Sequence, residues 1–122
     1  MVKLVELDPH VTVFQQMEDE GGPVILINKF DVAPEEVDQF LAAWGADANI
    51  MKGQPGLIST QLHRGIGGST VFLNYAVWES AAHFKRAFGN PEFQSRLKDY
   101  PSSAVASPHL FRKMAVAGIC VA

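Results

Sequence analysis

The sequence predicts an α+β protein in which helices cover one face of an antiparallel sheet. Four segments are rich in β-branched and other apolar residues, two others repeat apolar residues at helical spacing, and turns containing glycine or proline separate them. The chain has 122 residues, which is the length of one domain and enough to bury a core without disulfide bonds. With 48% apolar and 19% charged residues, it has the composition of a folded globular chain.

The first half of the chain predicts a strand followed by a helix. The segment PVILINKFDV, residues 23–32, is rich in β-branched residues and ends at a turn. Asp31 and Pro34 then open a helix with acidic residues in its first turn, where the helix dipole favours negative charge. This helix runs to about residue 51 and carries one apolar stripe. The stripe is formed by Val37, Phe40, Leu41, Trp44, Ala48 and Met51.

The second half predicts two strands, a helix and a last strand. The three strands are expected at residues 57–64, 70–78 and 109–119. The helix begins at Ser80, is interrupted at Pro91 and continues to about Tyr100, and the segment PSSAVASP after it is expected to be a loop. The order is therefore β-α-β-β-α-β, which is the ferredoxin-like arrangement of an antiparallel sheet with helices on one face.

The other face of this sheet also needs a cover. A second copy of the chain is the economical cover, because two-fold homodimers are the commonest oligomers. We therefore expect a homodimer, in the form of a dimeric α+β barrel. The predicted domain spans residues 23–118 and is followed by a tail, 119–122. Residues 1–22 are expected to form an N-terminal arm, in which VTVF at 11–14 is either a short edge strand or only part of the arm.

The charge and cysteine content argue against several functions. The net charge is −3 without a block of like charges, so we expect neither a nucleic-acid partner nor a membrane-surface partner. The single cysteine, Cys120, cannot form an internal disulfide or a multi-cysteine metal site, and the four histidines lack metal-ligand spacing. No signal peptide or membrane span is recognisable, so a cytoplasmic protein is expected.

Two predicted strands each place an asparagine among hydrophobic residues. Because side chains alternate along a strand, Asn74 and Trp78 share one face of the third strand, and Asn28 lies between Leu26 and Phe30 on one face of the first. A buried amide without a partner costs about 1–3 kcal/mol. That cost is understandable if Asn28, Asn74 and Trp78 line a cavity and await a ligand oxygen. The alternative is that each bonds a loop or packs in the core.

The apolar faces of the two predicted helices would supply the opposite wall of such a cavity. The residues expected to contact a bound molecule there are Phe40, Trp44, Phe84 and Phe88. His63 ends the second strand, in phase with Ser59 and Gln61. It is either a solvated surface residue or, if it faces the cavity, the natural general base, because the ordinary pKa of histidine is near neutral.

Four short motifs are similar to those of a known family. INKF at 27–30, QPGLIS at 54–59, LNYAVWES at 73–80 and AFGNPEF at 87–93 resemble the antibiotic biosynthesis monooxygenase domain. The resemblance covers about residues 23–116 and is closest to the small anthrone oxygenases, in which N-Y-A-x-W-E-S is a familiar run. It implies a cofactor-independent monooxygenase that oxidises an anthrone-like or hydroquinone-like aromatic to a quinone, with O2 as co-substrate and no metal, flavin or haem.

The resemblance also assigns roles to residues. Asn28, Asn74 and Trp78 match the family's strand asparagines and tryptophan, which implies that they stabilise the oxyanion of the reacting substrate. Stacking of Trp78 on the substrate rings is the alternative. His63 matches a strand-end histidine of some members and would act as the base. One departure is Phe84, where some members carry a tyrosine that would bond or relay a proton.

Two other functions stay open. The same fold includes members that bind small molecules or isomerise them without oxidation. The haem-degrading members need an iron-ligating histidine on the second helix, where this chain has Leu97, so a haem function is the weaker alternative. Oxygen uptake on addition of substrate separates an oxygenase from a binding module or an isomerase.

Overall fold

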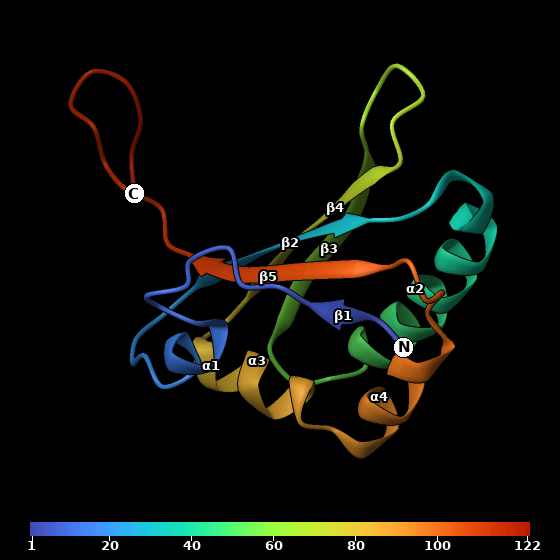
Figure 1. Cartoon of the computed structure of the whole chain (residues 1–122). Helices are drawn as coiled ribbons and strands as arrows, with labels where there is room; N and C mark the ends of the chain where they lie inside the picture. Colours follow the sequence, from blue (N-terminus) through green and yellow to red (C-terminus); the bar gives the residue numbers. More distant parts are fainter.

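The computed structural model describes residues 1–122 and contains one five-stranded sheet with helices against it (Figure 1). The strands are β1 (Lys3–Leu4), β2 (Val24–Asp31), β3 (Leu57–Arg64), β4 (Val71–Trp78) and β5 (Val105–Phe111). The helices are α1 (Val13–Gln16), α2 (Val37–Met51), α3 (Ala81–Phe88) and α4 (Pro91–Arg96), with short 3-10 helices η1 (Pro34–Glu36) and η2 (Leu97–Asp99). None of the helices has both the length and the apolar character needed to cross a membrane.

The strand order across the sheet is β1-β5-β2-β4-β3. β2 lies in the middle and pairs antiparallel with β4 on one side and with β5 on the other. β3 extends the sheet antiparallel beyond β4, and only the two-residue β1 runs parallel to its neighbour, β5. The β-α-β-β-α-β order and the ferredoxin-like class predicted from the sequence are therefore confirmed, with β1 and α1 added before them.

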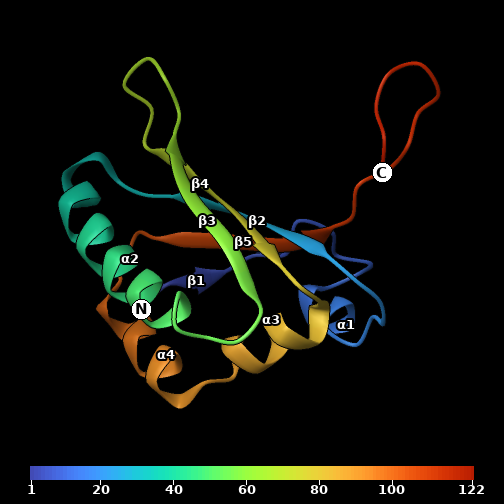
Figure 2. The same ribbon diagram turned by 180° about the vertical axis from the view of Figure 1, so that it is seen from behind.

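The helices gather on one side of the sheet, as Figures 1 and 2 show from opposite directions. The loop between β3 and β4 and the C-terminal segment after β5 extend away on the other side. The alternation along β4 explains which face the helices cover. Phe72, Ala76 and Trp78 point toward the helices and are at most 2% exposed, whereas Val71 and Tyr75 on the other face are 37% and 39% exposed.

The break predicted at Pro91 is a boundary between two helices. Ser80 caps the N-terminus of α3, and Asn90 caps that of α4, with Pro91 in the first helical position. The turn between them brings Phe88 and Phe93 together, with ring centroids 5.7 Å apart. Both short helices therefore contribute aromatic rings to the space between helices and sheet.

The last strand does not span residues 109–119, and the prediction of a loop over 101–108 is wrong for the second part of that segment. Serines and a proline are typical of a loop, but Pro108 lies where its missing N–H costs little. The carbonyl of Ala106 accepts a hydrogen bond from Val5 on the outer edge of β5. Pro108, two residues further on, faces the same outer edge beyond the end of β1, where no strand needs a donor.

The segment VTVF, residues 11–14, is not an edge strand, because α1 begins within it. The hydroxyl of Thr12 accepts a hydrogen bond from the N–H of Gln15, and the Gln15 side chain accepts one of 2.7 Å from the N–H of Thr12. This capping box starts a helix instead of a strand. Val13 is fully buried, so the N-terminal segment contributes to the core.

Two clusters of buried residues join the sheet to the helices. The first contains Val13, Met17, Val24, Leu26, Ala76, Trp78, Ala81, Phe84, Ala87 and Leu110. The second contains Phe30, Val32, Val37, Phe40, Ala43, Phe72, Tyr100, Ala104 and Ala106. Phe40 is fully buried in the second cluster, with ring centroids 4.8 Å from Phe72 and 5.0 Å from Phe30. Packing of this ring fixes α2 against the sheet.

We expect Phe40→Ala to lower the free energy of unfolding by about 3–5 kcal/mol, because it removes a fully buried ring that packs against other aromatic side chains. Urea denaturation followed by tryptophan fluorescence measures this loss. Leu41→Ala is the matched control, since Leu41 follows on the same helix but is 40% exposed. That change should cost less than about 1 kcal/mol. Equal losses in the two variants would show that Phe40 is not a core residue.

Candidate active site

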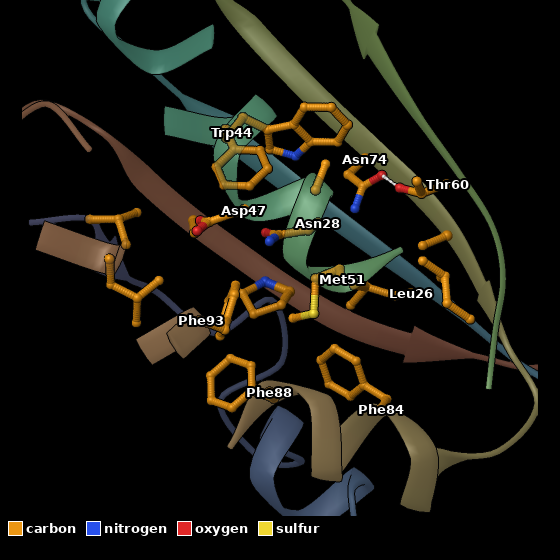
Figure 3. A pocket seen from close by; sticks show the side chains of 18 of the residues that line it. Leu26, Asn28, Trp44, Asp47, Met51, Thr60, Asn74, Phe84, Phe88 and Phe93 are labelled. Carbon is orange, nitrogen blue, oxygen red and sulfur yellow. Dashed lines mark hydrogen bonds between the residues drawn. The ribbon is translucent and has the colours of Figure 1, made fainter. Parts of the chain in front are cut away.

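A cavity of about 150 Å³ lies between the sheet and the helices (Figure 3). It reaches both core clusters and is lined by 21 residues, of which 16 are hydrophobic. Aromatic rings reach it from three helices: Trp44 on α2, Phe84 and Phe88 on α3, and Phe93 on α4. The amide, hydroxyl and carboxyl groups of the lining belong to Asn28, Asp47, Thr60, Asn74 and Tyr100. The cavity is thus an apolar space with a few placed polar groups, as ligand sites are.

The two strand asparagines are neighbours on β2 and β4. Asn28 pairs directly with Asn74 in the sheet register, so their Cβ atoms are about 5 Å apart on the helix side of the sheet. The Oδ1 atom of Asn74 accepts a hydrogen bond of 2.8 Å from the Thr60 hydroxyl on β3. This bond fixes the amide so that its NH2 group points into the cavity (Figure 3). The Oδ1 atom of Asn28 is buried without a partner.

Trp78 forms part of the wall where β4 ends. It is 1% exposed and lies opposite Val24 in the register of β2. Its ring packs edge-on against Phe84, with centroids 5.9 Å apart. The indole Nε1 is buried and has no hydrogen-bond acceptor. Because a buried N–H without a partner costs about 1–3 kcal/mol, a ligand oxygen that reached this donor would recover that free energy.

A carboxyl group lies on the helix side of the cavity. Asp47, on α2, is 4% exposed, and neither of its oxygens has a hydrogen-bond partner. Burial raises the pKa of Asp47 to about 6. Smaller effects come from the nearby Tyr100 hydroxyl, which lowers this pKa, from Asp99, which raises it, and from Arg96, which lowers it. The carboxyl is therefore mostly ionised at pH 7 and readily takes up a proton.

Tyr100 lies beside Asp47. Its ring is 4% exposed and stacks on Phe30, with centroids 6.2 Å apart. Burial, followed by the charge of Asp47, raises the pKa of the Tyr100 hydroxyl above its usual value. The phenol therefore stays protonated at neutral pH, where it can donate a hydrogen bond but cannot accept a proton.

Most of the residues predicted for the site line the cavity. These are Asn28, Trp44, Asn74, Trp78, Phe84 and Phe88, whose individual roles stay predictions. Phe40 does not line it, because the second core cluster encloses its ring, so its predicted contact with a bound molecule is wrong. His63 is exposed on the opposite face of the sheet, with its Nδ1 3.3 Å from the carbonyl oxygen of Leu73. The prediction that His63 is the base of this cavity is therefore wrong on geometry.

Sequence reasoning missed Asp47, Thr60 and Tyr100. Asp47 lies seven residues after Phe40 and four before Met51, so it falls on the apolar stripe of α2. A carboxylate on that stripe is the signal that would have found it. Thr60 carries no such signal, because it lies on an edge strand in which polar and apolar residues are mixed.

Residues 23–97 match the family model described as antibiotic biosynthesis monooxygenase. Among solved structures, SnoaB, a cofactor-independent oxygenase from Streptomyces nogalater, has a TM-score of 0.69 and 23% identity, over 80% of this chain and 99% of that one. A proposed monooxygenase from Shewanella loihica PV-4 has a TM-score of 0.67 and 31% identity, over 80% of this chain and 100% of that one. No curated protein matches the sequence.

The fold and the site define an α+β domain built around an apolar cavity with two strand amides. The chain belongs to the antibiotic biosynthesis monooxygenase family, which confirms the resemblance seen in its motifs. The matched segment, residues 23–97, includes β2, β4 and α2 and therefore Asn28, Asn74 and Asp47. β5 lies beyond that segment and still contributes Pro108 to the cavity lining.

The burial of Asp47 has a consequence for stability. Its pKa of about 6 in the folded chain, against an ordinary 3.8, means that ionisation disfavours folding by up to about 3 kcal/mol. The protonated Asp47 contributes its full stabilisation of the folded chain below about pH 4, and this stabilisation is lost as the pH rises through 6. We expect Asp47→Asn to abolish this dependence, so that the variant gains stability relative to the wild type by roughly 2–3 kcal/mol between pH 4 and pH 8.

Urea denaturation of both proteins at the two pH values measures that difference. Asp38→Asn is the matched control, because Asp38 is exposed on the same helix and its loss should show no relative gain at high pH. A constant difference between Asp47→Asn and the wild type at both pH values would show that Asp47 ionises in the folded chain as it does in water.

Proposed function

We propose that this chain is a cofactor-independent monooxygenase that oxidises an anthrone-like or hydroquinone-like aromatic to a quinone, with O2 as co-substrate. The observation that carries the proposal is the pair of amides, Asn28 and Asn74, set side by side in an otherwise apolar, aromatic cavity. In the anthrone case, a ring CH2 group and one O2 molecule become a C=O group and one water molecule. The substrate itself supplies the electrons.

The strand amides fit the charge that this reaction develops. Removal of the acidic C–H proton of an anthrone gives an aromatic phenolate, with negative charge on the former carbonyl oxygen. The NH2 group of Asn74, fixed by Thr60, is a preorganised donor for that oxygen, and the Asn28 amide and the Trp78 indole carry further N–H groups. Fixed donors in a dry site stabilise developing charge without reorganisation. The electron-rich anion can then transfer one electron to O2, and recombination gives a peroxide that loses water.

The aromatic wall fits a flat substrate. Phe84, Phe88 and Phe93 form a continuous row, with neighbouring ring centroids 5.8 Å and 5.7 Å apart. Aromatic rings pack well against such a row in edge-to-face or offset geometry. An apolar cavity of about 150 Å³ takes up a benzene ring, so this one has room for at least the reacting ring of a polycyclic substrate.

The comparisons support oxygen chemistry of this kind. SnoaB, which shares the fold, is described as a cofactor-independent oxygenase. The lining gives the haem alternative little support, because it contains no histidine and Leu97 takes the place where an iron ligand would be needed. Nowhere in the chain do three or more side chains of histidine, cysteine, aspartate or glutamate form a group that could hold a metal ion.

The proposal includes a homodimer formed through the sheet face that the helices leave uncovered. Ile27 and Tyr75 are register partners on this face, and Tyr75 is 39% exposed. The β3–β4 loop and the C-terminal segment stand out on this side (Figures 1 and 2). The exposed apolar residues of the C-terminal segment are Met114, Val116, Ile119 and Val121. A second copy lying between the two projections would cover both the sheet face and these side chains.

Tyr75→Glu should convert this dimer to a monomer, because it would bury an unpaired charge at the centre of the apolar face. Light scattering at micromolar concentration measures the change. Ser102→Glu adds the same charge at an exposed position in the loop before β5 and should leave the dimer intact. A wild-type chain that is monomeric under these conditions would contradict the proposed assembly.

We expect the wild-type protein to consume O2 and form a quinone from 1,8-dihydroxyanthrone (dithranol) without an added cofactor. Asn74→Ala removes the fixed donor and should lower kcat by about 10²–10³, with little change in KM. Trp78→Phe removes the indole N–H while keeping a ring and should also lower kcat. An oxygen electrode and the absorbance of the product measure both rates, after subtraction of the spontaneous reaction.

Two further variants sharpen the experiment. Ser102→Ala, at an exposed position in the loop before β5, is the control and should leave the rate unchanged. Thr60→Val keeps the shape of the wall but frees the Asn74 amide to rotate, so it should lower kcat less than Asn74→Ala does. If the wild type takes up no oxygen with any anthrone or hydroquinone, the oxygenase proposal fails and a binding or isomerase function takes its place.

A further inference from the structure

Asp47 lies in the cavity, yet the strand amides and the aromatic wall leave it without a function. Resting on the oxygenase function proposed above, we propose that Asp47 is the catalytic base, which takes the acidic C–H proton from the aromatic substrate held against Asn28 and Asn74. No other side chain of the cavity can accept that proton.

The residues that line the cavity exclude every other candidate for the base. Among its 21 residues, only Asp47 and Tyr100 titrate. Tyr100 stays a protonated phenol, because burial and the neighbouring carboxylate both disfavour its ionised form. His63 lies on the other face of the sheet and cannot reach the cavity of its own chain. Asp47 is therefore the one group that is ionised at neutral pH and in contact with the cavity.

The position of Asp47 fits the task. It lies on α2, whereas the two amides lie on β2 and β4, and in the view of Figure 3 its carboxyl group is drawn next to the Asn28 amide, with Asn74 further away. A substrate with its oxygen toward the NH2 group of Asn74 would present the opposite side of its reacting ring to α2. The base that removes the proton thus comes from a helix, and the donors that receive the charge come from the sheet.

A purely structural role does not account for this carboxyl group. Buried carboxylates normally form an ion pair or accept several hydrogen bonds. Asp47 is 4% exposed, forms no ion pair, and has two oxygens without a hydrogen-bond partner of good geometry. The nearby Tyr100 hydroxyl and the charge of Arg96 favour the carboxylate but do not offset its burial. An unpaired carboxylate in an apolar cavity destabilises the fold, and that cost is understandable if the group reacts with a ligand.

The proton transfer is balanced without a further reagent. The substrate C–H bond breaks, a new O–H bond forms on an Asp47 oxygen, and the electron pair of the broken bond enters the ring system. The charge reaches the former carbonyl oxygen beside Asn74. The negative charge in the cavity is conserved, because the neutralised carboxyl replaces the carboxylate as the phenolate forms. Oxidation by O2 is a later step and is not needed for this transfer.

The surrounding groups set the pH dependence of such a base. The segment after α4 brings Asp99 and the Tyr100 hydroxyl, α4 brings Arg96, and the sheet brings only the neutral amides of Asn28 and Asn74. Burial and Asp99 favour the protonated carboxyl, whereas Tyr100 and Arg96 favour the carboxylate. Because the carboxylate is the active form, the rate of proton removal should rise with pH through about 6 and level off above it.

Proton removal can be measured without oxygen. Under nitrogen in D2O, a base that removes the methylene proton of dithranol exchanges it for deuterium, which NMR follows. The wild type should accelerate this exchange. Asp47→Asn keeps the size of the side chain but removes the acceptor, so it should lower the catalysed exchange by about 10²–10⁴-fold and abolish the rise near pH 6. Asp38→Asn, on the exposed side of α2, should change neither.

Two other substitutions distinguish a base from a structural residue. Asp47→Glu retains a carboxylate and should keep the pH-dependent exchange at a reduced rate. Asp47→Ala leaves space for a small acid, and added formate should restore exchange in proportion to its concentration. Loss of a residue that only supports the fold would not be rescued by formate.

Exchange by Asp47→Asn at the wild-type rate, or Asp47→Ala that formate does not restore, would overturn the assignment. The oxygenase function is judged separately by oxygen uptake in air. Wild-type exchange that depends on Asp47 without oxygen uptake would support the base and overturn the oxygenase. Oxygen uptake that Asp47→Asn leaves unchanged would support the oxygenase and overturn the assignment of Asp47 as the base. A wild type that neither exchanges protons nor takes up oxygen with any anthrone or hydroquinone would overturn both.

Discussion

The direct pairing of Asn28 with Asn74 is the constraint on which the site depends. Because side chains alternate along a strand, the same register places Leu26 and Phe30 on the helix side of the sheet, where both are buried. A slip of β2 by one residue would turn the asparagine outward and bring Lys29 toward the helices. A buried amide alone would favour a register in which Asn28 faces the solvent. Burial of Leu26 and Phe30 on either side of it keeps β2 in the observed register.

The cavity is maintained at a cost to stability. Asn28 Oδ1, both oxygens of Asp47 and Trp78 Nε1 are buried without partners, and each such atom costs about 1–3 kcal/mol. The two core clusters offset this cost on either side of the cavity, with contacts such as the 4.8 Å approach of the Phe40 and Phe72 rings. Apolar side chains in place of these polar groups would give a more stable core. Polar atoms left unpaired where packing would favour hydrocarbon are the mark of a binding site.

The sequence revealed the central part of the fold better than its edges. Alternation located the two strand asparagines and the tryptophan, because β2 and β4 are central strands whose inner faces are otherwise apolar. β3 is an edge strand with a register shift between Leu57 and Ser59, so alternation does not decide which face His63 takes. Pro108 made the sequence of β5 resemble a loop. A strand tolerates a proline at this position only because the neighbouring β1 ends before it, which the sequence does not reveal. Asp47 escaped notice because a count of apolar residues passes over the one charged residue on the stripe.

The two walls of the cavity supply chemistry that neither supplies alone. A buried negative charge is costly in an apolar cavity unless hydrogen-bond donors surround it, and this holds for the carboxylate of Asp47 and for the phenolate of the substrate. Transfer of the proton to Asp47 moves the charge from α2, where the Tyr100 hydroxyl and Arg96 do not offset the burial of the carboxylate, to the sheet, where the NH2 group of Asn74 is fixed in advance. Burial makes the ionised form of Asp47 less stable before the reaction, and relief of this cost favours transfer of the proton to Asp47. In this scheme Asp47 removes the proton and Asn74 receives the resulting charge, so the two residues act in the same step. The losses of rate caused by removing each residue are therefore not expected to add when both are removed.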